Sequence, residues 1–272
     1  MRATIVRLIK QALGIHHQSG VEPLPAMRRI GSQRHPYFIP EKLLHADSIC
    51  YCIGAGEDIS FDTELKVVYD CRVVILDPTP YGIDHFEKLK DYAGRGIRLV
   101  LDEGHMVPFT YRITAQQLDA IQFVPLGVWT EKTVLTFHDP QMENYASYSV
   151  CLFTDSDKVI HAPVDRLGDI MRELGHGQLD LVKIEIEGAE YAVIDTIIED
   201  KLDIKLIVVE FDEVYNHKPR DLGFHFRIKR CCNRLRDAGY VMIHSTPQLK
   251  RSFLRRDVFD QLKRTASAAS IS

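Results

Sequence analysis

The sequence predicts an α/β fold in which a mainly parallel sheet is covered by helices on both faces. Short apolar segments alternate with amphipathic segments along most of the chain, which is typical of strands joined by helices. A near-continuous apolar run, such as residues 206–209, suits a strand that is buried on both sides. The chain has 272 residues, of which 45% are apolar and 26% are charged, so it can bury a substantial core.

The elements follow from local spacing and from turn residues. Strands are predicted at residues 48–53, 72–77, 123–128, 180–186 and 205–211, with two closing strands at 240–244 and 252–254. Helices are predicted at residues 83–92, 164–174, 189–198 and 222–238, and also around Phe61, Leu65 and Val68, which recur at helical spacing. Gly239 is a suitable stop for the last of these helices. Residues 97–113 suit an extra hairpin or a long loop.

The first 15 residues form a cationic amphipathic segment, in which Arg2, Arg7 and Lys10 interrupt an apolar pattern. We interpret this segment as a short helix that packs on the domain; the alternative is a helix that lies weakly on a membrane surface. No apolar stretch reaches the length of a membrane span.

Charge and cysteine usage exclude some classes of function. The net charge is −4, and without a basic excess we expect no nucleic-acid partner. The six cysteines form no C-x2-C pair, which disfavours a structural zinc site. Cys50, Cys52 and Cys71 lie in or beside apolar runs and indicate small buried hydrophobes in a reducing cytoplasm.

Ligands of open parallel sheets bind beyond the carboxyl ends of the strands, where this sequence places glycines and an acid. Gly54 and Gly56 follow the first strand; they suit a close ligand approach, or only a turn. Asp77 ends the second strand and could accept both ribose hydroxyls of a nucleoside, or only form a turn before Pro78. Ile59 replaces the third glycine of the dinucleotide fingerprint, which favours a smaller nucleoside ligand.

Charged residues recur near the fourth predicted strand. Lys183, Glu185 and Glu187 alternate with isoleucines, so a strand would place them on one face, and Glu190 lies one turn away. They could form the floor of an active site. The alternative is a structural salt bridge between Lys183 and a carboxylate, with the acids partly exposed to solvent at the strand end. Trp129 could be a wall for an adenine ring or a core aromatic. His217 could be a general base or an incidental loop residue.

One predicted helix carries an excess of positive charge. Its basic residues are Arg227, Lys229, Arg230, Arg234 and Arg236. This pattern is typical of a solvated face, and the alternative is a phosphorylated or acidic substrate.

These motifs resemble those of a known family. The segment LVKIEIEGAE at residues 181–190 strongly resembles the LLKIDVEGAE signature of FkbM-type methyltransferases. GAGEDISFD at 54–62 and DPTP at 77–80 resemble the cofactor motifs of one branch of that family, and GVW at 127–129 and SYS at 147–149 resemble its middle region. The resemblance covers about residues 47–256; the KIEIEGAE part is quite specific and the glycine turn is not.

The resemblance implies a Rossmann-like class I methyltransferase fold, with seven mainly parallel strands of which the last is antiparallel. It also implies S-adenosyl-L-methionine as methyl donor. Together with the patterns above, it predicts a cofactor-binding set of Gly54, Ala55, Gly56, Asp58, Asp77, Pro78, Gly127 and Trp129. The predicted catalytic set is Lys183, Glu185, Glu187, Glu190 and His217.

We expect the methyltransferase domain at residues 41–258. Residues 1–40 would be an N-terminal extension made of a helix and an irregular lead-in, and residues 259–272 a C-terminal tail that is frayed from residue 265. The stretch 131–164, rich in Thr, Ser, Tyr and Phe, would be an inserted antiparallel hairpin or a lid.

Members of this family typically methylate hydroxyls of sugars, glycans or secondary metabolites, so we expect a small-molecule or glycan acceptor. The acceptor proton could pass to Glu185, Glu187 or His217, or a carboxylate-held divalent cation could lower the pKa of the hydroxyl. Two departures from the family pattern are Cys52, where an acid is common, and Glu185, where Asp is usual. The alternatives are a catalytically silent cofactor-binding module and an NAD-dependent oxidoreductase.

Overall fold

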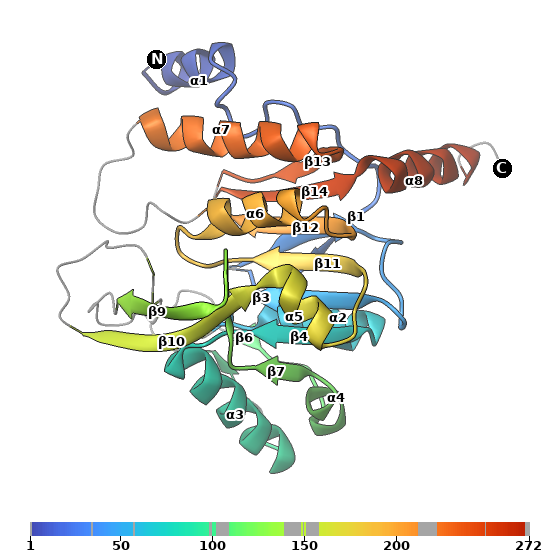
Figure 1. Ribbon diagram of the computed structural model, residues 1–272. Helices are drawn as coiled ribbons and strands as arrows, with labels where there is room; N and C mark the ends of the chain where they lie inside the picture. The colour runs from blue at the N-terminus through green and yellow to red at the C-terminus, as the bar shows by residue number, and fades with distance from the viewer. Residues whose placement is uncertain are drawn as a thin grey trace.

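A seven-stranded sheet forms the centre of the protein, in the order β13-β14-β12-β11-β3-β4-β7 (Figure 1). Its strands are β3 (Ile49–Ile53), β4 (Arg72–Leu76), β7 (Gln122–Val124), β11 (Leu179–Ile184), β12 (Ile204–Glu210), β13 (Tyr240–Ser245) and β14 (Lys250–Arg255). The structure is a computed structural model that describes residues 2–33, 35–56, 58–97, 100–101, 109–138, 148, 150, 158–211, 222–247 and 249–269.

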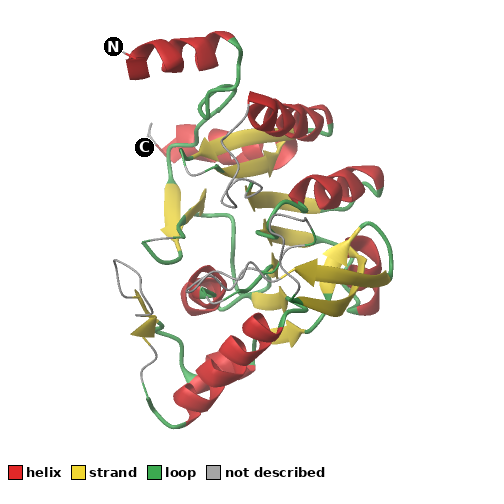
Figure 2. Cartoon of the chain, turned by 90° about the vertical axis from the view of Figure 1, so that its left-hand side faces the viewer, coloured by secondary structure: helices red, strands yellow, loops and turns green. Residues whose placement is uncertain are grey.

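The strand directions agree with the predicted fold class. Neighbouring strands among β3, β4, β7, β11 and β12 pair parallel. Strand β14 pairs antiparallel with both β12 and β13, so the last strand in the sequence is the reversed one. The carboxyl ends of the parallel strands lie on the left in Figure 1, and Figure 2 views the chain from that side. The predicted mainly parallel sheet with an antiparallel last strand is confirmed.

Helices cover both faces of the sheet. One face packs against α5 (Leu167–Glu173), α6 (Glu190–Glu199) and α7 (Leu222–Asp237). The opposite face packs against α2 (Ser60–Tyr69), α3 (Pro80–Gly94), α4 (Ala115–Asp119) and α8 (Arg256–Ala269). Because both faces are covered, alternate side chains of β3 enter different cores: Cys50 and Cys52 one, Tyr51 and Ile53 the other.

The predicted buried cysteines are confirmed, since Cys50, Cys52 and Cys71 are all inaccessible free thiols.

The lead-in between the first helix and the sheet is more ordered than we predicted. Strands β1 (Met27–Ile30) and β2 (Tyr37–Pro40) pair antiparallel and pack on the α2 face of the sheet. Ile30, Tyr37 and Ile39 are buried there. The prediction of an irregular segment was wrong because the strands are only four residues long and their apolar partners are distant in sequence.

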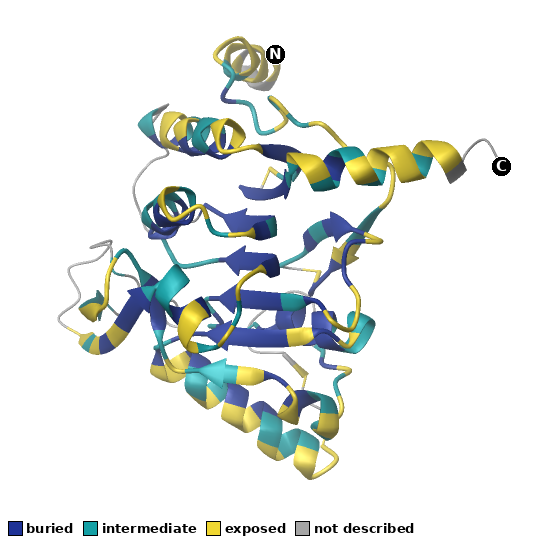
Figure 3. Cartoon of the chain, turned by 45° about the vertical axis from the view of Figure 1, so that its right-hand side comes forward, coloured by how far each residue is buried: buried dark blue, intermediate teal, exposed yellow. Residues whose placement is uncertain are grey.

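Helix α1 (Arg2–Ala12) projects from the rest of the chain (Figure 3), which it contacts near its end, where Lys10 Nζ lies 2.9 Å from His225 Nε2. Its apolar residues Val6, Leu8 and Ile9 are 47–55% exposed, and Leu13 beyond it is 40% exposed. The prediction that this helix packs on the domain was therefore wrong for its apolar residues Val6, Leu8 and Ile9. No described helix is both long and apolar enough to cross a membrane.

The predicted strand at residues 123–128 is in fact two strands in different sheets. Strand β7 ends at Val124 and belongs to the central sheet, whereas β8 (Gly127–Trp129) pairs with β10 (Val159–Arg166). Pro125 lies between them and cannot donate a backbone hydrogen bond, so the run divides there.

Two antiparallel pairs lie in the regions expected to hold hairpins. Strand β9 (Thr133–His138) pairs with β10, and β5 (Val100–Leu101) pairs with β6 (Phe109–Thr110). Residues 139–147, 149 and 151–157 of the expected hairpin or lid lie outside the described residues.

Several element ends also differ from the predictions; for example, β11 ends at Ile184, two residues before the predicted end. Strand β10 extends to Arg166, so the helix predicted at 164–174 begins only at Leu167. Helix α8 continues to Ala269 through most of the segment expected to be frayed.

The turn after β3 depends on a glycine. Gly54 has φ +86°, and a Cβ atom there would lie 1.9 Å from the carbonyl oxygen of Glu185. The backbone on both sides is fixed, since the Gly54 N–H donates to Leu76 O (2.9 Å) and the Glu185 N–H donates to Ile53 O (3.0 Å). The ends of β3 and β11 can approach this closely only without a side chain at residue 54.

We expect Gly54→Ala to lower the free energy of unfolding by at least about 3 kcal/mol, because it combines a backbone clash with a left-handed φ. Gly56→Ala is the matched control: Gly56 has φ +52°, but no atom lies within 4 Å of its Cβ position, so we expect a loss of about 1 kcal/mol. Urea denaturation measures both. Equal losses in the two variants would contradict the close approach.

Candidate active site

Asp77, at the carboxyl end of β4, organises the glycine turn. The carboxylate is 4% exposed, and its Oδ2 accepts from the backbone N–H of Ala55 (2.7 Å) and of Gly56 (3.1 Å). Its Oδ1 accepts from the N–H (2.7 Å) and the hydroxyl (2.6 Å) of Thr79. Two hydrogen bonds on each oxygen fill the acceptor capacity of the carboxylate, so a ribose hydroxyl would have to replace one of them.

The rest of the glycine turn offers space on one side. No atom lies within 4 Å of the Cβ position of Gly56, so a ligand can approach the backbone there. The carboxylate of Asp58 already makes hydrogen bonds within the protein: it accepts from the Ser32 hydroxyl (2.9 Å) and from the Ser60 N–H (2.9 Å). Asp58 therefore ties the start of α2 to the segment before β2.

Gly127 and Pro78, both predicted to bind cofactor, lie together. A Cβ atom on Gly127 would be 2.8 Å from Val164 Cγ1 and 3.1 Å from Pro78 Cγ, so β8 packs tightly against both residues. Trp129 ends β8 opposite Arg166 of β10 and is partly buried. It belongs to the three-stranded sheet rather than to the central sheet.

Lys183 links the glycine turn to the acidic segment. Its side chain is 2% exposed, and its Nζ donates to the carbonyl oxygen of Gly54 (2.9 Å). The same ammonium lies 3.4 Å from Asp62 Oδ2 and 3.5 Å from Glu185 Oε2. Lys183 and Glu185 thus share a face as predicted, whereas Glu187 lies beyond the strand in a turn with φ +53°.

Glu185 is surrounded by groups that the sequence did not single out. The Tyr37 hydroxyl donates to its Oε2 (2.9 Å), and His35 Nδ1 lies 3.4 Å from its Oε1. Lys250 Nζ lies 4.0 Å from Glu185 Oε1 and 2.7 Å from Glu210 Oε2. We call this group the charged cluster; its members are His35, Tyr37, Asp62, Lys183, Glu185, Glu210 and Lys250.

The charged cluster shifts the titration of its members. Burial opposes ionisation of Glu185, but Lys250, Lys183 and His35 together hold its pKa well below the usual range. Burial also opposes the charge on His35, yet the neighbouring carboxylates of Glu185 and Glu210 raise its pKa to about 9. At neutral pH the histidine is therefore protonated and Glu185 is a weak base.

The same cluster contains three potential metal ligands. Donor atoms of His35, Glu185 and Glu210 lie within 4.8 Å of one another. Lys250 already places an ammonium 2.7 Å from one of these acids, and a divalent cation would be repelled by it at close range. With Lys250 in place, this group does not fit a divalent cation.

Glu190 supports the turn that carries Glu187. It is inaccessible to solvent, and its carboxylate accepts from the N–H of Ile186 (3.1 Å) and of Gly188 (3.0 and 3.1 Å). Burial raises its pKa to about 8 despite these bonds. His217, the remaining predicted catalytic residue, lies outside the described residues.

We expect the free energy of unfolding to fall as pH rises from about 6.5 to about 9. Folded His35 holds its proton to about pH 9, whereas an unfolded histidine loses it near 6.5, so the stabilisation is present below that window and lost across it. His35→Gln should remove about 2–3 kcal/mol of the fall, as measured by urea denaturation at both ends of the window. Glu190, whose pKa is also raised in the folded state, lowers the free energy of unfolding over part of this window equally in the wild-type protein and in His35→Gln. Parallel pH profiles would rule out this role of His35.

Comparison with known proteins identifies the family. A family model described as the methyltransferase FkbM domain matches residues 8–242. Curated proteins give no match.

Three similar solved structures are distant in sequence. A precorrin-6y C5,15-methyltransferase from Geobacter metallireducens GS-15 is 13% identical, with a TM-score of 0.39, over 78% of this chain and 82% of that chain. The METTL16 methyltransferase domain is 10% identical, with a TM-score of 0.40, over 77% and 60%. A Methanococcus jannaschii fibrillarin pre-rRNA processing protein is 10% identical, with a TM-score of 0.39, over 78% and 68%. These similarities carry no argument about function.

The family model spans most of the sequence, and it includes both the glycine turn and the KIEIEGAE segment that Lys183 joins. The chain therefore belongs to the FkbM methyltransferase family.

Proposed function

We propose that the protein uses S-adenosyl-L-methionine to methylate a hydroxyl oxygen of a sugar, a glycan or another small metabolite. Family membership establishes a methyltransferase, and the cofactor and the acceptor are our proposal. The observation that supports it is the contact between two motifs far apart in sequence: Lys183 donates to the Gly54 carbonyl, and Gly54 packs against the backbone of Glu185. A nucleoside on the glycine turn would extend toward the acids of the second motif.

The proposed cofactor site comprises the glycine turn, Asp58, Asp77, Pro78, Gly127 and Trp129. The open space at Gly56 suits an approaching ligand, and Asp77 would exchange the longest of its hydrogen bonds, that from the Gly56 N–H at 3.1 Å, for a ribose hydroxyl. Cys52 is inaccessible, so we assign it no cofactor contact. When bound, S-adenosylmethionine supplies a methyl group on a sulfonium that is a good leaving group, which leaves alignment as the main task of the protein.

The acceptor hydroxyl must also lose a proton, and we assign this role to Glu187. Three cations stabilise the charge of Glu185 and make it a weak base, and Glu190 is bound to the turn backbone. Glu187 lies on that turn with a left-handed backbone, φ +53°, which is uncommon for a residue with a side chain and is often found at functional positions. His217 remains a second candidate base in this proposal.

Calorimetric titration tests the cofactor. We expect S-adenosylmethionine and S-adenosylhomocysteine to bind and NAD to give no heat. Asp77→Asn should weaken the binding of S-adenosylhomocysteine by about 10-fold or more, because the new side chain loses acceptor capacity for both the turn and the ribose. If neither sulfur compound gives a calorimetric response with the wild-type protein, the proposal fails.

Glu187→Gln tests the base. We expect turnover to fall by about 100-fold, since an amide cannot take the proton, while the affinity for S-adenosylhomocysteine changes by less than about 2-fold. The measurement is release of S-adenosylhomocysteine, with an acceptor found by screening hydroxylated sugars and metabolites. The control Glu87→Gln removes an exposed acid on α3 and should keep wild-type turnover. Full activity of Glu187→Gln would reject its role.

A further inference from the structure

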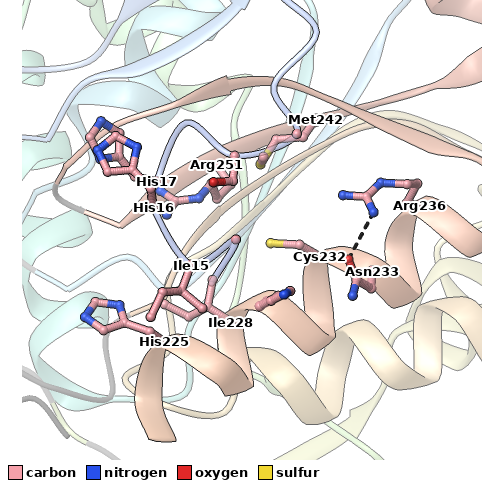
Figure 4. Close-up of a pocket in the computed structure, with 14 residues that line it drawn as sticks. Ile15, His16, His17, His225, Ile228, Cys232, Asn233, Arg236, Met242 and Arg251 are labelled. Carbon is pink, nitrogen blue, oxygen red and sulfur yellow. Dashed lines mark hydrogen bonds between the residues drawn. The ribbon is translucent and has the colours of Figure 1, made fainter. Parts of the chain in front are cut away.

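A pocket of about 340 Å³ lies away from the glycine turn, between the segment after α1, helix α7 and strands β13 and β14 (Figure 4). Six of the fourteen residues that line it are basic. They are His16, His17, His225, Lys229, Arg236 and Arg251. Among the residues that the structure describes, no acidic residue lines the pocket.

Hydrogen bonds hold the walls of this pocket together. The Ser245 hydroxyl donates to His17 O (2.6 Å), and the Glu22 N–H donates to Met242 O (2.8 Å), which fixes the N-terminal segment on β13. On the other side, Lys229 Nζ donates to Leu13 O (2.8 Å). The basic groups are therefore positioned before any ligand arrives.

Arg251 is the strongest evidence for a ligand. It is 5% exposed, and its Nη1 donates to the carbonyl oxygens of Thr246 (3.0 Å) and Lys250 (2.9 Å). Burial lowers the pKa of this guanidinium, and in the part of the chain that the structure describes no carboxylate pairs with it. A buried charge without a counter-ion is costly, and an anion in the pocket would offset that cost.

Two other basic groups in the pocket, Lys229 and Arg236, also lack an acidic partner among the residues that the structure describes. Arg236 Nη1 donates to Asn233 Oδ1 (3.0 Å), and among the described ion pairs none joins Lys229 or Arg236 to a carboxylate. Arg234, on the same helix, does pair with Asp195. The pKa of His17 is lowered by burial and by the positive charges of His16, Arg251 and Lys10, which indicates a positive potential in the pocket.

We propose that this pocket binds a phosphate group, supplied either by a soluble phosphate compound or by the headgroup of an anionic lipid. Guanidinium and ammonium groups that line one cavity suit the several acceptor oxygens of a phosphate. The site is separate from the charged cluster: Lys250 and Arg251 are neighbours on β14, but Lys250 contacts Glu210 and Arg251 lines the pocket. This inference does not rest on the proposed methyl transfer.

A lipid source has a structural counterpart beside the pocket. Lys10 of α1 lies 2.9 Å from Nε2 of His225, a pocket residue, so the helix crosses close to the basic lining. The exposed apolar residues of α1, Val6, Leu8 and Ile9, suit contact with a bilayer interface. The experiment must therefore compare soluble phosphate with phospholipid.

The probes are inorganic phosphate, titrated calorimetrically at low ionic strength, and phosphatidylcholine vesicles with and without phosphatidic acid, assayed by co-sedimentation. The test variant is Lys229→Ala/Arg236→Ala. Arg230→Ala is the matched control, because Arg230 is an exposed basic residue of α7 that does not line the pocket. An unchanged circular dichroism spectrum and an unchanged urea midpoint show that each variant is folded.

We expect phosphate or phosphatidic acid vesicles to bind the wild-type protein and Arg230→Ala alike, and the double variant at least about 10-fold more weakly. Weakened binding of free phosphate supports a soluble ligand. Weakened binding of the acidic vesicles alone supports a lipid headgroup. The proposal is overturned if the wild-type protein binds neither probe, or if Arg230→Ala loses as much affinity as the double variant.

Discussion

The carboxyl edge of the sheet depends on one buried charge, the ammonium of Lys183. A charge at this depth is tolerated only when its donors are satisfied and acids lie close by, and the Gly54 carbonyl, Asp62 and Glu185 meet these needs. The ends of β3 and β11 are drawn together as a result, with no room for a side chain at residue 54. The shape of the glycine turn thus follows from the electrostatics of the neighbouring strand.

Neutrality of the charged cluster involves parts of the chain that are far apart. Three acids, Asp62, Glu185 and Glu210, lie near Lys183, Lys250 and a protonated His35. The β1–β2 hairpin contributes His35 and the Tyr37 hydroxyl to this cluster. Lys250 Nζ also lies 4.1 Å from the centre of the Tyr37 ring. The hairpin therefore forms a structural part of the candidate active site rather than a separate extension.

The central sheet could be predicted from the sequence because long apolar runs such as β12 specify buried strands locally. The charged cluster could not, since Tyr37 and Glu185 are 148 residues apart and nothing near Tyr37 signals its partner. The β1–β2 strands were not predicted because such short strands are determined by tertiary packing. The division of one apolar run into two strands was not predicted because it depends on a single residue, Pro125.

The beginning of β14 joins two environments. Lys250 and Arg251 are consecutive on this strand and extend to opposite faces of the sheet, one toward Glu210 and the other toward the basic pocket. Peptide geometry couples their positions, because a displacement of the strand backbone moves both side chains. An occupant that draws in the guanidinium would also change the distance from the ammonium to Glu210. By thermodynamic reciprocity, a change in the Lys250–Glu210 ion pair would change the affinity on the far side to the same extent.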